Sequence, residues 1–203
     1  MQKNNTSSKK MNSKYFHTSK LMNEALISLL EIKAYEFITV KEVCDKAGVN
    51  RSTFYLHYEG MQDLLSETIE GLNQELYNYY KMEATEFMKK IQQADANELI
   101  IINKDFLMPY LQFVKDNQKV FFAASKNPSA MQTDLHFNNI KKYIMLPIMN
   151  KFNIPKDEQS YWIAFYLYGV NAIIQQWISE ECNDSPEHVI NAIIHCVRPH
   201  NIN

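Results

Sequence analysis

Side chains that donate hydrogen bonds cluster in the short stretch from Arg51 to His57. The guanidinium of Arg51 presents a fork of N–H donors that can bind a guanine at two points, and Ser52 and Thr53 add hydroxyls beside it. Tyr55 and His57 follow on the same short segment. These residue types on one helix are typical of contacts to base edges and phosphates in the major groove of DNA.

The flanking residues predict a helix-turn-helix that would position these donors. Thr39 and Glu42 have the spacing of a capping box at the start of a helix, and Gly48 stands where that helix must stop and the chain must turn. Asn50 can cap a second, short helix that begins at Arg51. The first helix would pack through an apolar stripe at helical spacing, formed by Val40, Val43, Cys44 and Ala47.

The stretch as a whole resembles the N-terminal DNA-binding domain of TetR-type (TetR/AcrR) transcriptional regulators. The resemblance covers roughly residues 18 to 66, and beyond them it is one of layout only. It is carried by Thr39, Ala47-Gly48-Val49, the run from Ser52 to Tyr58, and Leu64-Leu65.

The resemblance implies DNA contacts for the matching polar residues. Four of them would meet backbone phosphates: Thr39, Lys41, Tyr55 and His57. Three would reach base edges: Arg51, Ser52 and Thr53. The alternative for Tyr55 and His57 is that they pack and hydrogen-bond only within the domain.

One position departs from the pattern of the family. Members commonly carry a lysine after the loop, where it meets a phosphate at the start of the next helix, and this chain has Met61 there. The missing cation is expected to weaken binding to the DNA backbone and its dependence on salt. Two interpretations stay open: lysines near the N-terminus compensate, or the protein is a co-regulator of the same fold that acts through protein contacts without binding DNA.

Length and composition predict an all-α protein. The 203 residues are 46% hydrophobic and 22% charged, and 4 Gly and 6 Pro provide little turn chemistry for a many-stranded fold. Residues 1–65 hold nine Lys and Arg against seven Asp and Glu, whereas the remainder holds twelve against sixteen. A slightly basic front and an acidic back suit a DNA-binding head on a body kept off the phosphates.

The order of the helical patterns predicts three parts. These are a flexible basic tail over residues 1–17, a helix-turn-helix domain over 18–66, and a helical effector-binding and dimerisation domain over 67–203. Low apolar content predicts that residues 1 to about 16 stay unordered, although their lysines also allow a basic arm along DNA phosphates. Apart from the motif, helices are expected over 18–34, from Met61 onward, and over 99–114, 129–152, 156–181 and 187–197, with a boundary at 92–97.

Aromatic and methionine side chains of the body are candidates for an apolar effector pocket: Tyr110, Phe113, Phe122, Met145, Met149, Trp162 and Tyr166. At helical spacing such residues are also typical of a plain core. The resemblance implies a repressor that an unidentified small molecule releases from a palindromic operator. No cofactor is expected.

The last two long helices resemble those that form a four-helix bundle between two subunits in regulators of this type. Apolar residues spread around more than one face of 156–181, which predicts a helix buried on two sides. Gly169 would allow the close approach of another helix. The residues expected at the homodimer interface are Tyr161, Phe165, Tyr168, Gly169, Ala172, Ile190 and Ile194.

The sequence offers little for other classes of function. It lacks a glycine-rich phosphate loop, a nucleophile elbow and a plausible pair of carboxylates, so no enzyme is predicted. No stretch approaches the ~20 apolar residues of a membrane span, and three cysteines fit a reducing cytoplasm, although Cys182 and Cys196 stay open as a pair. One C-terminal group matches no common zinc spacing, so no metal is expected there: Cys182, His188, His195, Cys196 and His200.

Overall fold

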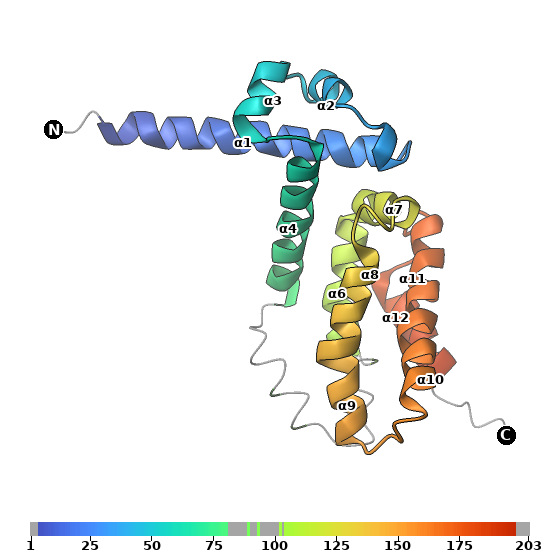
Figure 1. Cartoon of the computed structure of the whole chain (residues 1–203). Helices are drawn as coiled ribbons and strands as arrows, with labels where there is room; N and C mark the ends of the chain where they lie inside the picture. The colour runs from blue at the N-terminus through green and yellow to red at the C-terminus, as the bar shows by residue number, and fades with distance from the viewer. Residues whose placement is uncertain (1–3, 81–88, 90–92, 94–101, 103, 198–203) are drawn as a thin grey trace. The chain divides into compact units, whose positions relative to one another are not determined.

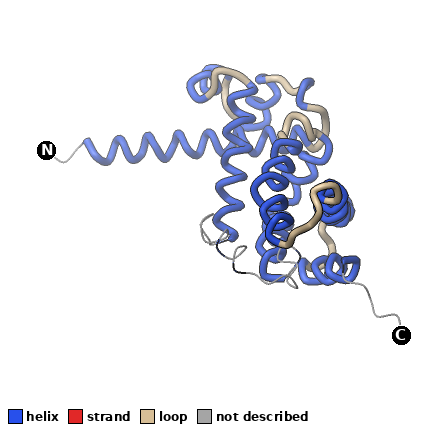
Figure 2. Tube along the Cα trace, turned by 60° about the horizontal axis from the view of Figure 1, so that its bottom comes forward, coloured by secondary structure: helices blue, strands red, loops and turns tan. Residues whose placement is uncertain are grey.

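The computed structural model describes residues 4–80, 89, 93, 102 and 104–197. This described part contains helices, turns and loops but no strand, which confirms the all-α prediction (Figures 1 and 2). The chain divides into two compact units, Met1–Leu72 and Asn73–Asn203, which we call the head and the body. Among the described helices, none is both long enough and apolar enough to cross a membrane.

The head contains α1 (Asn4–Leu30), α2 (Val40–Ala47), α3 (Arg51–His57) and the first part of α4 (Met61–Tyr80). A 3-10 turn joins α1 to α2, and Figure 1 shows α2 and α3 lying beside α1. Fully buried apolar side chains fill the head: Met22, Leu26, Leu30, Val43, Phe54, Leu64 and Leu65. Burial of side chains of this size stabilises a fold by roughly 1.5 to 3 kcal/mol each.

α1 differs from its prediction at both ends. It begins at Asn4 rather than Thr18 and ends at Leu30 rather than Ala34, so the prediction of an unordered segment was wrong for residues 4–16. Extending an existing helix closes one hydrogen bond for each residue fixed, whereas a new helix needs a costly nucleus. The packed turns around Met22 and Leu26 supply that nucleus. Because the nucleus lies outside residues 4–16, the low apolar content of those residues does not predict whether they join the helix.

The body is built from α6 (Lys104–Asp116), α7 (Gln118–Lys126), α8 (Thr133–Ile140), α9 (Leu146–Lys151), α10 (Gln159–Ile163), α11 (Gly169–Ser179) and α12 (Pro186–Val197). π-helical turns join α8 to α9 and α10 to α11, so each pair forms one continuous helical segment. α12 packs on α6 and α11, and α11 also packs on α7.

The body has two apolar clusters. The larger is formed mainly by α6, α11 and α12 and includes Leu111, Trp177 and Ile193. The smaller is formed by Met145, Met149 and Ile163. Tyr166 packs against both clusters.

Several helix boundaries in the body differ from the sequence-based expectation. The helix predicted over 129–152 starts at Thr133, because Gln132 adopts a positive φ of 53° at the preceding turn. The helix predicted from Lys156 starts at Gln159, and α7 was not predicted as a separate helix. α6 contains Pro109 and ends at Asp116, two residues beyond the predicted end at Val114. The boundary expected at 92–97 lies outside the described residues apart from Gln93.

Candidate nucleic-acid interface

A capping box fixes the start of α2, as predicted. The hydroxyl oxygen of Thr39 accepts the N–H of Glu42 at 3.3 Å, and the Glu42 carboxylate accepts the N–H of Thr39 at 3.0 Å. Nζ of Lys33 lies 2.5 Å from the same carboxylate, and this contact, with those from Thr39, lowers the pKa of Glu42 to about 2. Thr39 and Lys41 remain exposed at this end of α2.

The turn between α2 and α3 has the geometry that its residues predict. Gly48 ends α2 in the left-handed conformation, with φ 69°, and its N–H donates to the carbonyl of Cys44. The side-chain oxygen of Asn50 caps α3 by accepting the N–H of Thr53 at 2.7 Å. Local sequence signals therefore position α3 relative to α2.

In the N-terminal turn of α3, two polar side chains are hydrogen-bonded to the cap residue and a third is not. The hydroxyls of Ser52 and Thr53 donate to the oxygen of Asn50 at 2.6 and 2.8 Å, so their lone pairs stay available as acceptors. Arg51 is exposed, and the described part of the chain gives its guanidinium no hydrogen bond or ion pair. Arg51 is thus the side chain with donors available for an external acceptor such as guanine.

The C-terminal end of α3 is partly covered by α1. The imidazole of His57 stacks on the ring of Tyr15, with ring centroids 3.9 Å apart and an angle of 21° between the planes. Nδ1 of His57 is buried and has no hydrogen-bond partner among the described residues, and burial lowers the pKa of this imidazole. A phosphate contact by His57 would therefore use Nε2 of the neutral ring, while Tyr55 stays exposed beside it.

A polar network, which the sequence did not reveal, ties α1, α3 and α4 together. The Tyr58 hydroxyl donates to Oε1 of Glu67 at 2.9 Å, and Nδ2 of Asn23 donates to the same oxygen at 3.1 Å. The hydroxyl of Thr68 has two acceptors within hydrogen-bonding distance for its one hydrogen: Oδ1 of Asn23 and the carbonyl of Leu64. Burial and the Glu67 carboxylate raise the pKa of Tyr58. Because the two contacts of Asn23 join residues 44 and 45 positions apart in the chain, no local spacing signals them.

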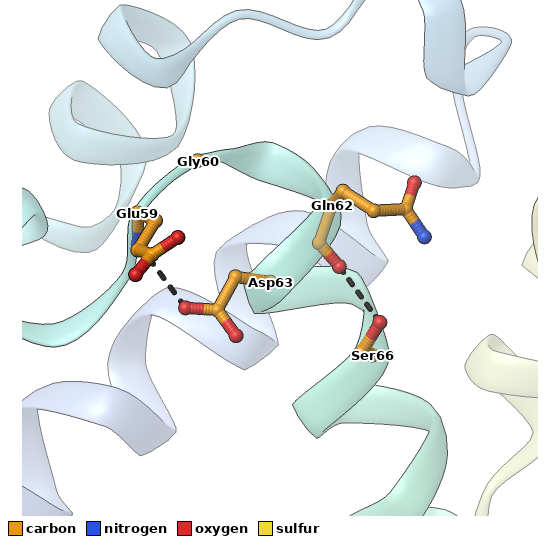
Figure 3. Close-up of a pocket in the computed structure, with 5 residues that line it drawn as sticks. All are labelled: Glu59, Gly60, Gln62, Asp63 and Ser66. Carbon is orange, nitrogen blue, oxygen red and sulfur yellow. Dashed lines mark hydrogen bonds between the residues drawn. The ribbon is translucent and has the colours of Figure 1, made fainter.

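The start of α4 is acidic. Met61 is half-buried there, and Glu59 and Asp63 lie exposed on either side of it in the sequence. An open hollow of about 640 Å³ lies against this helix end, lined by Glu59, Gly60, Gln62, Asp63 and Ser66 (Figure 3). The N–H of Glu59 donates to Asp63 at 3.1 Å. The carboxylates of Glu59 and Asp63 would repel a phosphate, so we expect this helix end to contribute little to binding the DNA backbone.

The residues suggested for an effector pocket do not all fall in one cluster. Tyr110 and Phe122 pack on the larger cluster, whereas Met145, Met149 and Trp162 belong to the smaller one. Phe113 is buried and makes an edge contact with Phe121. Burial raises the pKa of Tyr110 to about 12. A shared pocket for these residues stays a prediction.

The residues suggested for the dimer interface differ in exposure. Tyr161, Phe165 and Tyr168 are 76%, 57% and 54% exposed within one subunit. The apolar residues that suggested the second buried face therefore form a surface of the single subunit, and their burial against a partner stays a prediction. Ile190 is only 1% exposed and belongs to the core of its own subunit, so it has no surface to offer a partner.

The remaining residues suggested for the dimer interface are Gly169, Ala172 and Ile194. Ala172 is exposed, and Ile194 packs partly against the larger cluster. A Cβ placed on Gly169 would have no described atom within 4 Å, so no helix of the same subunit is seen to approach it closely.

Metal ligands do not gather in the described residues. No group of three or more His, Cys, Asp or Glu side chains lies close enough there to hold an ion. Cys44, Cys182 and Cys196 are free thiols, and Cys182 is buried whereas Cys196 is exposed. His200, the last member of the C-terminal group, lies outside the described residues.

The capped α2, the left-handed turn and the exposed start of α3 define a helix-turn-helix protein. Comparison with known families gives the same class: residues 24–68 match "Bacterial regulatory proteins, tetR family", and residues 103–198 match "Transcriptional regulator C-terminal region". The chain belongs to the TetR family of transcriptional regulators. Neither family is described as an enzyme, in agreement with the prediction.

Two curated relatives are also described as regulators. The uncharacterized HTH-type transcriptional regulator YxbF of Bacillus subtilis (strain 168) is 28% identical over 179 residues, which are 83% of this chain and 41% of that protein. The HTH-type dhaKLM operon transcriptional activator DhaS of Lactococcus lactis subsp. lactis (strain IL1403) is 27% identical over 135 residues, 62% of this chain and 69% of that protein. The chain thus spans less than half the length of the first relative.

A solved structure shares the fold. The fatty acid degradation regulator FadR from Bacillus halodurans aligns with 89% of this chain and 96% of its own, with a TM-score of 0.55 and 11% identity. At that identity the likeness concerns the fold alone.

Proposed function

We propose that the protein is a sequence-specific DNA-binding regulator that acts as a homodimer in the cytoplasm, where bacterial DNA lies. The observation that carries the proposal is that Arg51, at the start of a capped α3, is exposed and that its guanidinium has no hydrogen bond or ion pair with a described residue. Ser52 and Thr53 stand beside it, and Thr39 and Lys41 are exposed at the start of α2. Two copies of α3 would read half-sites about 34 to 36 Å apart in a palindromic operator.

The homodimer is supported by the exposed aromatic face of Tyr161, Phe165 and Tyr168. Exposed apolar surface of this kind typically marks an interaction site. Gly169 and Ala172 continue the helical spacing of this face and are exposed, whereas Ile190 is buried. Burial against a second copy would remove the aromatic rings from water.

Regulation by a small molecule is the second half of the proposal. The effector would bind among the apolar side chains of the body and stabilise a dimer whose two heads cannot span the operator, which releases DNA and makes repression the default. The aromatic and methionine residues around Tyr166 are the candidates for that site. The relative from Lactococcus lactis is named an activator, so the sign of regulation is a separate question for experiment.

Selection from a random duplex library tests the DNA-binding function, because the operator is not needed in advance. We expect the full chain to enrich a palindromic sequence with two half-sites about one helical turn apart. Enrichment of no sequence, together with no binding to any duplex at low salt, would refute the proposal.

A second candidate is a co-regulator of the same fold that acts through protein contacts. The acidic start of α4, with Met61 between Glu59 and Asp63, favours it because a phosphate would be repelled there. This candidate predicts that duplex DNA is not bound and that regulation requires a second protein.

A further inference from the structure

The N-terminal half of α1 contains lysines but no acidic residue. Residues 1–23 contain five lysines and no acidic residue, and the first carboxylate is that of Glu24. Three of these lysines lie within the first eleven residues of α1: Lys9, Lys10 and Lys14. Lys10 and Lys14 are one helical turn apart, and the Lys14 side chain is exposed.

This basic segment is attached to the recognition helix. The ring of Tyr15 stacks on the imidazole of His57 at 3.9 Å, directly after Lys14 in the chain. The hydrogen bonds of Asn23 with Glu67 and Thr68 hold the next turns of α1 against α4. α1 is therefore anchored beside the C-terminal end of α3, and Figures 1 and 2 show it continuing as one helix toward the N-terminus.

The opposite situation holds at the start of α4. Met61 stands there, with the carboxylates of Glu59 and Asp63 nearby and no lysine or arginine among residues 58–64. A protein that lacks a backbone cation at one point of its interface needs others to keep its affinity, since phosphate contacts supply most of the non-specific binding energy.

We propose that the N-terminal half of α1 is a basic arm, consisting of Lys9, Lys10 and Lys14 and positioned by the stack of Tyr15 on His57, which binds the phosphate backbone beside α3. The partner is the sugar-phosphate backbone of duplex DNA, irrespective of sequence, because the arm offers lysine ammonium groups and no planar fork for base reading. This inference rests on the proposed DNA-binding function, and it adds to that function the source of the backbone affinity.

The test compares the salt dependence of DNA binding between two triple variants of the full chain. One variant carries Lys9→Gln, Lys10→Gln and Lys14→Gln, and the matched control carries the same change at three exposed lysines of the body: Lys119, Lys141 and Lys156. The probe is a fluorescein-labelled duplex of mixed sequence, titrated at several salt concentrations by fluorescence anisotropy.

The arm variant should lower the slope of log K against log salt by about 2 to 3, since each lost phosphate contact removes about 0.9. Its affinity at about 0.1 M salt should fall by roughly tenfold or more, and the control should match the wild type. An unchanged slope in the arm variant, with the wild type still binding, overturns the arm and leaves the proposed function in place. Absence of duplex binding by the wild type overturns both.

A second pair of variants tests the positioning role of Tyr15. Tyr15→Ala removes the stack on His57, whereas Tyr15→Phe keeps an aromatic ring there. We expect Tyr15→Ala to lose part of the salt slope although every lysine is retained, and Tyr15→Phe to keep it. Equal slopes in Tyr15→Ala and the wild type would show that the stack does not position the arm. Unfolding curves of both variants check that the head remains folded.

Discussion

The ring of Tyr15 lies nearly parallel to the imidazole of His57, with 3.9 Å between their centroids, and so covers one side of the last residue of α3. This contact joins two segments that are far apart in sequence and fixes the end of the recognition helix. Nδ1 of His57 is buried and has no hydrogen-bond partner among the described residues.

Acid should destabilise the head through His57. Burial lowers the pKa of its imidazole in the folded state, and the carboxylate of Glu67 opposes that shift only in part. The unfolded chain therefore binds the proton more readily. The contribution of a neutral His57 to stability is present above the unfolded pKa of about 6.5 and is lost as the pH falls below it.

Urea unfolding of the wild type and of His57→Gln at a series of pH values checks this expectation. As the pH falls from about 6.5 to about 5, the free energy of unfolding of the wild type should decrease relative to that of His57→Gln. A constant difference across that range would contradict the assignment.

Asn50→Ala should destabilise the head by about 1 kcal/mol, because it removes the cap of α3. The change also releases the hydroxyls of Ser52 and Thr53, which both donate to the Asn50 oxygen. Asn50→Asp is the matched control, since a carboxylate also caps well and should keep most of the stability. The free energy of unfolding in urea measures both, and equal losses in the two variants would rule out the cap as the cause.

Alanine should have opposite effects at two glycines of the head. Gly48→Ala should cost about 1 to 2 kcal/mol, because φ is 69° there and a Cβ is unfavourable in the left-handed region. Gly71 lies inside α4, and alanine should stabilise that helix by roughly 0.5 to 1 kcal/mol. Neither new Cβ would have a described atom within 4 Å, so sterics do not confuse the comparison. Loss of stability in both variants would contradict the conformational explanation.

Phe165→Glu should dissociate the proposed homodimer. It places a carboxylate on the exposed aromatic face, where burial against a second copy would leave the charge without a partner. Phe37→Glu is the control, because Phe37 is also an exposed aromatic residue but lies in the head. Sedimentation equilibrium measures the mass of both variants. A wild-type protein that is monomeric throughout, or a dimer unaffected by Phe165→Glu, would refute this interface.

Local signals in the sequence were sufficient to predict the helix-turn-helix. Thr39 with Glu42, Gly48 and Asn50 each act through backbone groups within four residues of themselves, so their spacing carries the information. The stack of Tyr15 on His57 and the bond of Asn23 to Glu67 depend on tertiary packing, and no spacing rule reports them.

In the body, the sequence pattern does not determine which apolar residues are buried. Apolar residues on several faces of residues 159–179 suggested burial on two sides, but the pattern cannot tell a core from a surface reserved for a partner. Tyr161 and Phe165 are exposed within the subunit, whereas Ile163 and Ile174 are buried. Periodicity identifies which residues are apolar, and only the packing of the other helices decides which of them are covered.

The central claim is that Arg51 reads a base, and a comparison of specific with non-specific affinity tests it most directly. Wild type and Arg51→Ala would be titrated at one salt concentration against the duplex obtained by selection and against a scrambled duplex of the same composition. We expect Arg51→Ala to lose roughly 1 to 3 kcal/mol of binding free energy on the selected duplex and much less on the scrambled one. An equal loss on both duplexes, or no loss on either, would contradict it.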